Sequence, residues 1–202
     1  MADSRRTRRL ILALTSALVV MTGAVATNAA AGTDRRHPGS SALQVELYGL
    51  DGSAVGWVTM REVRDKVVVK GVARGLTPGF HGFHVHAVGV CDPAAPTGPF
   101  TTAGGHYAGA LPNHGDHAGD LPSLLVMTDG TAYSSFATDR FDLDDLRDTD
   151  GSAVMVHAGR DNFANIPTRY TAGGVAGPDA TTLATGDAGG RVACGVIPPL
   201  TH

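Results

Sequence analysis

Short apolar runs that alternate with polar residues, each followed by a turn signal, are the feature that most restricts how this chain can fold. The first run is Leu43-Val45-Leu47, and Asp51-Gly52 forms the turn after it. Because successive side chains of a strand point to opposite faces, this alternation predicts strands with one buried face. The pattern predicts eight strands, at residues 43–47, 54–60, 67–72, 81–88, 123–127, 132–138, 153–157 and 191–197.

Two long segments interrupt the strands, at residues 91–121 and 158–190. Loops of this length in compact domains are usually functional or disordered, and the histidines of the first segment favour function. Residues 141–146 predict a turn or a short helix. With 27 glycines and only 5% aromatic residues, the chain is expected to be all-β. We therefore predict an antiparallel sandwich or flattened barrel with two long functional loops.

The sequence His84-Val85-His86 lies within the fourth expected strand. The period of two places both imidazoles on one face, where they can share a metal ion. His81 lies three residues earlier, so it is expected on the opposite face as a buried, hydrogen-bonded support. The alternative is a pair of solvated histidines on an exposed strand. The company of other histidines favours a metal, because seven of the nine lie between residues 81 and 157.

Further candidate ligands lie in the two long loops. His114, His117 and Asp120 offer two imidazoles and a carboxylate within seven residues, a donor set that zinc accepts, although a solvated polar loop is the alternative. His106 follows two glycines, which allow the backbone to approach another element. His157 ends a strand, and Asp161 follows it by four residues. Sites rich in imidazole suit copper and zinc.

The N-terminus is typical of a targeting signal. Four arginines precede an apolar segment and small residues, which predicts a signal peptide over residues 1–31 and a flexible segment over 32–41 before a domain over 42–202. A retained membrane anchor is the alternative. No lipid anchor is expected, because no cysteine lies near the expected cleavage site. Cleavage leaves 12 basic and 18 acidic residues of the original 16 and 19, which argues against nucleic-acid binding.

Export also bears on Cys91 and Cys194, the two cysteines of the chain. In an oxidising compartment they most simply form a disulfide with each other. Closing a loop of about 100 residues stabilises the fold by roughly 4 to 5 kcal/mol in the chain-entropy description. A reduced, metal-binding pair is the alternative, and the wide spacing argues against it.

Five segments together resemble the copper,zinc superoxide dismutases, particularly the exported bacterial ones. They are Gly-Phe-His-Gly-Phe-His-Val-His at 79–86, Ala-Gly-Gly-His at 103–106, His-Ala-Gly-Asp-Leu at 117–121, Val-Met-Val-His at 154–157 and Gly-Gly-Arg-Val-Ala-Cys-Gly-Val-Ile at 189–197. The resemblance covers nearly all of the mature chain. It implies an eight-stranded antiparallel Greek-key sandwich or flattened barrel.

The resemblance also implies a site and an activity. Copper would be held by His84, His86, His106 and His157, and zinc by His106, His114, His117 and Asp120. His106 would bridge the two metals, Asp161 would link a ligand of each, and Arg191 would attract an anion beside copper. The expected function is conversion of superoxide to dioxygen and hydrogen peroxide outside the cytoplasm, in the extracellular space or cell envelope, by a possible homodimer.

The sequence departs from the family in the zinc loop. His114 and His117 are closer together than in typical members, and Tyr107-Ala108-Gly109 replaces the usual Phe-Asn-Pro. Some exported members contain copper alone, so zinc stays open at this point. A second hypothesis is a copper-binding or copper-delivering module on the same fold that lacks turnover. The complete histidine set and Arg191 favour the enzyme.

Overall fold

The computed structural model describes residues 42–201. The expected signal peptide (1–31) and N-terminal segment (32–41) lie outside the described residues. Within residues 42–201, no helix has the length and apolar character needed to cross a membrane. The strands are β1 (Leu43–Gly49), β2 (Ala54–Val63), β3 (Lys66–Ala73), β4 (Gly79–His81), β5 (Phe83–His86), β6 (Leu124–Val126), β7 (Ala132–Thr138), β8 (Ser152–His157), β9 (Thr171–Ala172), β10 (Val175–Ala176) and β11 (Arg191–Ile197).

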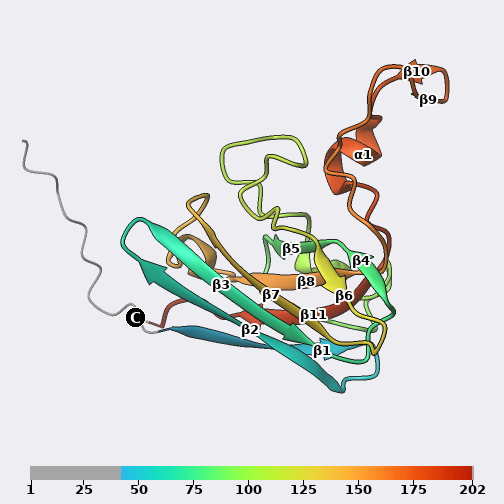
Figure 1. Cartoon of the computed structure of the whole chain (residues 1–202). Coiled ribbons are helices and arrows are strands. Elements are labelled where there is room, and N and C mark those ends of the chain that lie inside the picture. Colours follow the sequence, from blue (N-terminus) through green and yellow to red (C-terminus); the bar gives the residue numbers. More distant parts are fainter. Residues whose placement is uncertain (1–41, 202) are drawn as a thin grey trace, which may run out of the picture. The chain divides into compact units, whose positions relative to one another are not determined.

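Nine of these strands form one antiparallel sheet in the order β4-β6-β7-β3-β2-β1-β11-β8-β5. β4 and β5 stand at the two ends of this order although Gly82 alone separates them in the chain, so the sheet nearly closes into a barrel (Figure 1). Each of the eight expected strands is present, and the predicted all-β antiparallel fold is confirmed. In Figure 1 both long loops rise from the side of the sheet where β5 and β8 lie.

The expected strand at residues 81–88 is in fact divided at Gly82. β4 pairs with β6 and β5 pairs with β8, so the chain changes neighbours at this residue. A Cβ at position 82 would lie 2.6 Å from the Cβ of Ala188, which explains the need for glycine. Beyond β5, the amides of Ala87 and Val88 donate to carbonyls of the first long loop instead of to another strand. The alternating pattern alone does not reveal either change of partner.

The apolar face of the sheet fills the barrel. β1 buries Val45 and Leu47, and β3 buries Val67 and Val69, in the alternation that the sequence predicts. β5 and β8 differ because every one of their residues is buried. Their inner side chains join the core, and their outer side chains are covered by the long loops. This covered outer face carries the candidate site.

A smaller apolar cluster lies under the first long loop. Phe100 and Ala103 of this loop pack with Met155 of β8 and with Cys194 of β11. Cys91 and Cys194 form the expected disulfide, with Cα atoms 5.7 Å apart and a sequence separation of 103. The prediction of this pairing is confirmed. The disulfide anchors the start of the first loop to β11, next to the site.

The long loops contain short elements that the sequence does not predict. The second loop carries the β9–β10 hairpin and the helix α1 (Ala180–Thr185), whose first turn is capped by the Asp179 side chain accepting from the amide of Thr182. Six residues are too few for a helical periodicity to emerge. The first loop carries the 3₁₀ turn η1 (Thr101–Ala103), and η2 (Asp145–Arg147) overlaps the turn or short helix expected at 141–146.

Candidate metal centre

Four buried imidazoles meet on the outer face of β5 and β8. His84 and His86 extend from β5, and His157 ends β8. His106 lies in the first long loop, where its backbone pairs with that of His86 in a single β-bridge. One ligand nitrogen of each of the four lies within 4.8 Å of those of the other three. We call His84, His86, His106 and His157 the first donor group. The alternative of solvated histidines is excluded, because the four rings are buried.

Backbone carbonyls orient two of these rings. His86 Nδ1 lies 3.0 Å from the carbonyl oxygen of Gly104, and His157 Nδ1 lies 3.0 Å from that of Gly189. A carbonyl only accepts, so each Nδ1 carries the proton and donates it. The Nε2 atoms of the two rings, 3.3 Å apart, are then left with lone pairs that face each other. Two lone pairs at this separation suit a shared cation.

Asp161 orients two further histidines. Its two carboxylate oxygens each lie 2.7 Å from an Nε2 atom, Oδ2 from that of His84 and Oδ1 from that of His114. Both Nε2 atoms therefore donate, which leaves Nδ1 of each ring as the atom that can bind a metal ion once it carries no proton. Among residues 42–201, the buried Nδ1 of His84 has no hydrogen-bond partner. Asp161 thus links the first donor group to a second one.

The second cluster surrounds Asp120. Its Oδ1 lies 3.0 Å from His106 Nδ1 and 3.1 Å from His114 Nδ1. His117 Nδ1 lies 3.5 Å from Asp120 Oδ2, is buried, and has no hydrogen-bond partner in the described part of the chain. The second set of donor atoms that all lie within 4.8 Å of one another contains His84, His106, His114 and Asp120, and it does not include His117. We group His117 with His106, His114 and Asp120 because its ring is buried against Asp120, and we call these four residues the second donor group.

Three rings of the first donor group are held neutral by their surroundings. Burial lowers the pKa of His157 to about 3 and that of His106 to about 4, and neighbouring imidazoles add to the shift. Burial also lowers the pKa of His86 well below its ordinary value. Neutral imidazoles are the form that binds a metal ion. The lone pairs of these three rings are therefore available at neutral pH without loss of a proton.

The second donor group has the opposite electrostatics. Burial alone would lower the pKa of His114, but hydrogen bonds to Asp120 and Asp161 outweigh it and raise this pKa to about 9. Burial alone would raise the pKa of Asp120, but its hydrogen bonds with His106 and His114 outweigh that and lower it. The group therefore combines carboxylate charge with imidazole nitrogen. A cation that binds here must displace a proton from His114.

The residues present fit two metal ions. Burying a polar nitrogen without a partner is costly, and His84 Nδ1 and His117 Nδ1 are two such atoms, one in each donor group. A metal ion in each group would satisfy them. Four imidazoles suit copper, and three imidazoles with a carboxylate suit zinc.

Comparison with known proteins agrees with this donor set. A profile of the family described as Copper/zinc superoxide dismutase (SODC) matches residues 54–197. The chain belongs to this family. A Cu-Zn superoxide dismutase of Mycobacterium tuberculosis is 46% identical over 191 residues, covering 88% of this chain and 79% of that protein. A Cu-Zn superoxide dismutase of Photobacterium leiognathi is 36% identical over 166 residues, covering 77% and 86%.

Solved structures lead to the same family. The structure of the Cu/Zn superoxide dismutase from Brucella abortus is similar with a TM-score of 0.61 at 32% identity, and the match covers 78% of this chain and 99% of that chain. The resemblance seen in the sequence is confirmed.

A cavity of about 500 Å³ opens beside the first donor group of this superoxide dismutase family member. His106 and His157 line it together with Arg191, whose guanidinium donates to the carbonyls of Phe100 at 2.5 Å and Gly104 at 2.6 Å. Burial lowers the Arg191 pKa, yet a guanidinium stays charged at neutral pH. A fixed cation thus faces the space that leads to the two rings.

His81 lies where the sequence places it, away from the donor atoms. Its Nδ1 lies 2.6 Å from the carbonyl oxygen of His157, and its Nε2 lies 2.8 Å from that of Thr77. Neither donor group found among the described residues includes it. His81 is buried and ties β4 to the end of β8, next to a ligand-bearing residue.

Sequence reasoning missed the backbone groups of the site. The Gly104 carbonyl accepts from both His86 and Arg191, and the Gly189 carbonyl accepts from His157. Gly186 was missed as well. A Cβ at this position would lie 2.2 Å from His114 Nε2, so only glycine leaves room for that ring. Glycines beside histidines were the available signal. Every residue has a backbone carbonyl, so the sequence does not show which carbonyls accept from the site's side chains.

Proposed function

We propose that this protein is an exported superoxide dismutase that holds copper in the first donor group and zinc in the second. The convergence of four buried imidazoles beside a cavity that contains Arg191 is the observation that carries the proposal. The family of the chain and the names of its relatives support the same activity. Superoxide is the expected substrate.

The first donor group and the cavity have separate tasks in this proposal. Copper held there would supply one-electron redox chemistry, by which two superoxide ions and two protons give one dioxygen and one hydrogen peroxide. Arg191 attracts the small anion and holds it near the rings, because its charge is permanent and its position is fixed by two carbonyls. His86 and His157 keep their Nε2 lone pairs turned to the same point through their bonds to Gly104 and Gly189.

The second donor group supports the rings of the first. His106 belongs to both groups, and Asp161 connects His84 to His114. Zinc in the second group would fix His106 and the loop that carries His114 and His117. Although this loop is short, its two imidazoles and one carboxylate form a complete set of four zinc ligands together with His106. This donor set argues for zinc in addition to copper.

Two observations support a location outside the cytoplasm. The disulfide between Cys91 and Cys194 is typical of oxidising compartments. The arginines and the apolar segment within residues 1–31 are typical of a signal peptide. Export would place the enzyme in the extracellular space or the cell envelope.

The test measures superoxide decay with the protein loaded with copper and zinc. Arg191→Met should lower the rate constant about tenfold and weaken its dependence on ionic strength, because steering by fixed charge raises encounter rates by 10-fold or more. Copper content should stay unchanged. Arg169→Met is the matched control, since Arg169 lies over the Tyr170 ring next to the β9–β10 hairpin and does not line the cavity.

The outcome also separates the enzyme from a copper carrier. A carrier would bind copper tightly but remove superoxide no faster than the background of copper in buffer. That result, or an unchanged rate in Arg191→Met, would overturn the proposal.

A further inference from the structure

The loop over residues 114–120, which we call the ligand loop, is held from two opposite sides. Asp120 Oδ2 accepts from the backbone amides of Gly115 at 2.7 Å and His117 at 3.0 Å. Arg140 Nη1 donates to the carbonyls of the same two residues, at 3.3 Å and 3.1 Å. A carboxylate therefore holds the N–H groups of Gly115 and His117, and a guanidinium holds their C=O groups.

Arg140 comes from the barrel, not from either long loop. It follows β7, which pairs with β3 over seven residues, and its own amide donates to Thr138 Oγ1 at 3.2 Å. The next residue, Phe141, is buried in the core. The base of the Arg140 side chain therefore lies between the end of β7 and a core residue. This placement connects the backbone carbonyls that its guanidinium contacts to the barrel.

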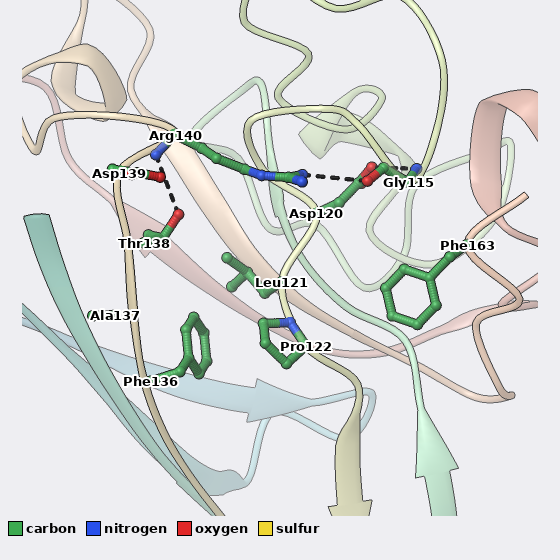
Figure 2. Close-up of a pocket in the computed structure, with 10 residues that line it drawn as sticks. All are labelled: Gly115, Asp120, Leu121, Pro122, Phe136, Ala137, Thr138, Asp139, Arg140 and Phe163. Atoms are coloured by element: carbon green, nitrogen blue, oxygen red, sulfur yellow. Dashed lines mark hydrogen bonds between the residues drawn. The ribbon is translucent and has the colours of Figure 1, made fainter.

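A cavity lies between the ligand loop and the end of β7. Its volume is about 480 Å³, and Leu121, Pro122, Phe136 and Phe163 are among the residues that line it. Figure 2 shows the Arg140 side chain extended along one edge of this cavity toward Gly115 and Asp120. The cavity separates the ligand loop from the end of β7, and the Arg140 side chain crosses this gap to reach the carbonyls of Gly115 and His117.

His117 depends on this bridge more than His114 does. The ring of His114 is bonded to Asp161, and its amide donates to Leu183 at 2.7 Å. The ring of His117 has no hydrogen-bond partner at Nδ1 among residues 42–201, so its direction follows from its backbone. The Asp120 carboxylate holds the N–H of that backbone, and its C=O accepts from Arg140 and from the Asp120 amide, each at 3.1 Å.

We propose that Arg140 is a positioning residue for His117, and that it sets the zinc affinity of the second donor group from the barrel side. The inference rests on the proposed zinc site. It also gives a physical reason why so short a ligand loop can keep its three zinc ligands in place. Only two residues separate His114 from His117, and Arg140 adds a tie from the barrel side to the carbonyls of Gly115 and His117.

The experiment compares zinc affinity by chelator competition, using the copper-loaded full chain. Arg140→Met should weaken zinc binding about tenfold, the lower end of the range for outer contacts of a metal site. Arg140→Lys keeps the charge but loses the planar guanidinium. Its zinc affinity should lie between those of the unmutated protein and Arg140→Met. Arg147→Met is the control, because Arg147 Nε also donates to a backbone carbonyl, that of Pro198 at 3.1 Å, away from the ligand loop.

Cobalt supplies a readout that general destabilisation would not change. Co²⁺ placed in the second donor group has an absorption spectrum that reports its ligand geometry. Arg140→Met should shift this spectrum, and Arg147→Met should leave it as in the unmutated protein. An unchanged spectrum with a lower melting temperature of the metal-free protein would mean that Arg140 serves stability alone, which would overturn the inference.

A double-mutant comparison separates the inference from the zinc assignment itself. If Arg140 acts through His117, then Arg140→Met should have little further effect on zinc affinity in a His117→Ala background. An equal effect in both backgrounds would overturn the inference. If His117→Ala alone leaves zinc affinity unchanged, the assignment of the second donor group fails instead.

Discussion

The two donor groups of this protein are built in different ways. Three members of the first group lie on strands of the sheet, so their positions follow from the strand pairing of β5 with β8. The three other members of the second group lie in the ligand loop and are placed by Asp120, Asp161 and Arg140. The first group is a property of the barrel, and the second is a property of a hydrogen-bond network. Each should therefore fail in its own way.

Their charges differ as well. Burial keeps His86, His106 and His157 neutral, so these three rings offer lone pairs without any change of protonation. In the second group, hydrogen bonds to two carboxylates outweigh burial and raise the pKa of His114 to about 9. The three neutral rings are ready for a metal at neutral pH, whereas the second group must release a proton when the metal binds. His106 is the one residue that belongs to both.

The largest expected effects come from removing one ligand from each group. His86→Ala should abolish tight copper binding and lower superoxide decay by more than about 100-fold, beyond the range for outer contacts of a metal site. Zinc content should remain. His117→Ala should lose zinc with copper retained, and should lower the rate far less. Metal content by mass spectrometry and superoxide decay kinetics provide the two readouts.

This pair of variants tests the proposed independence of the groups. The loss of both metals from either variant would show that the barrel and the ligand loop form one cooperative unit. The two donor groups would then not bind their metals independently, although the assignment of ligands would stand.

Most strands and the pair His84 and His86 were predictable because they follow from simple periodicity. Alternation identified the sheet strands apart from the division of β4 from β5, and the period of two placed His84 and His86 on one face with Val85 inside. The burial and hydrogen bonding expected for His81 are present, although it lies on β4 and not on the strand of His84. The prediction for His84 and His86 needed no knowledge of neighbours, because a residue's face depends on its place within its own strand.

Features that depend on contacts between distant segments were not predictable in this way. Gly82 divides an expected strand because Ala188, over 100 residues away, leaves no space for a Cβ. The carbonyl of Gly104 orients His86 and Arg191, and Arg140 reaches the ligand loop from β7. No local sequence pattern marks these residues, because each acts on a partner that only the fold brings close.

Asp161 contacts a histidine of each donor group, so its replacement should change both metal affinities, by less than the loss of a ligand does. Asp161→Asn places an amide NH₂ against an imidazole N–H that now lacks an acceptor. Zinc affinity should fall by about 10- to 100-fold, as for other outer contacts, and copper affinity by less, because β5 still positions His84. Chelator competition for each metal gives the measurement.

A matched control for this variant is Asp179→Asn. It lies in the same long loop and caps α1, where asparagine serves equally well. Neither metal affinity should change in it. Equal losses of copper and zinc in Asp161→Asn would instead show that the strand does not hold His84 by itself.

The smallest expected effect is the pH dependence of the metal-free protein, in which each group limits stability on one side. The folded pKa values of His157 and His106, about 3 and about 4, lie below the unfolded value of 6.5. The unfolded chain therefore binds more protons below pH 6.5, and stability should fall from pH 6.5 to 4, by on the order of 1 kcal/mol per pH unit. His114 acts in the opposite direction: its folded pKa of about 9 stabilises the fold below pH 6.5, and this contribution is lost as the pH rises to 9.

Urea unfolding of the metal-free protein at a series of pH values measures both limbs of this dependence. His157→Gln should flatten the acid limb, because it removes a histidine that is neutral only when folded. Asp161→Asn should flatten the alkaline limb, because it removes a carboxylate that holds the proton on His114. If both variants altered the same limb, the histidines of the two donor groups would not titrate separately. The contrast between neutral rings on strands in the first group and a protonated His114 in the loop of the second group would then be wrong.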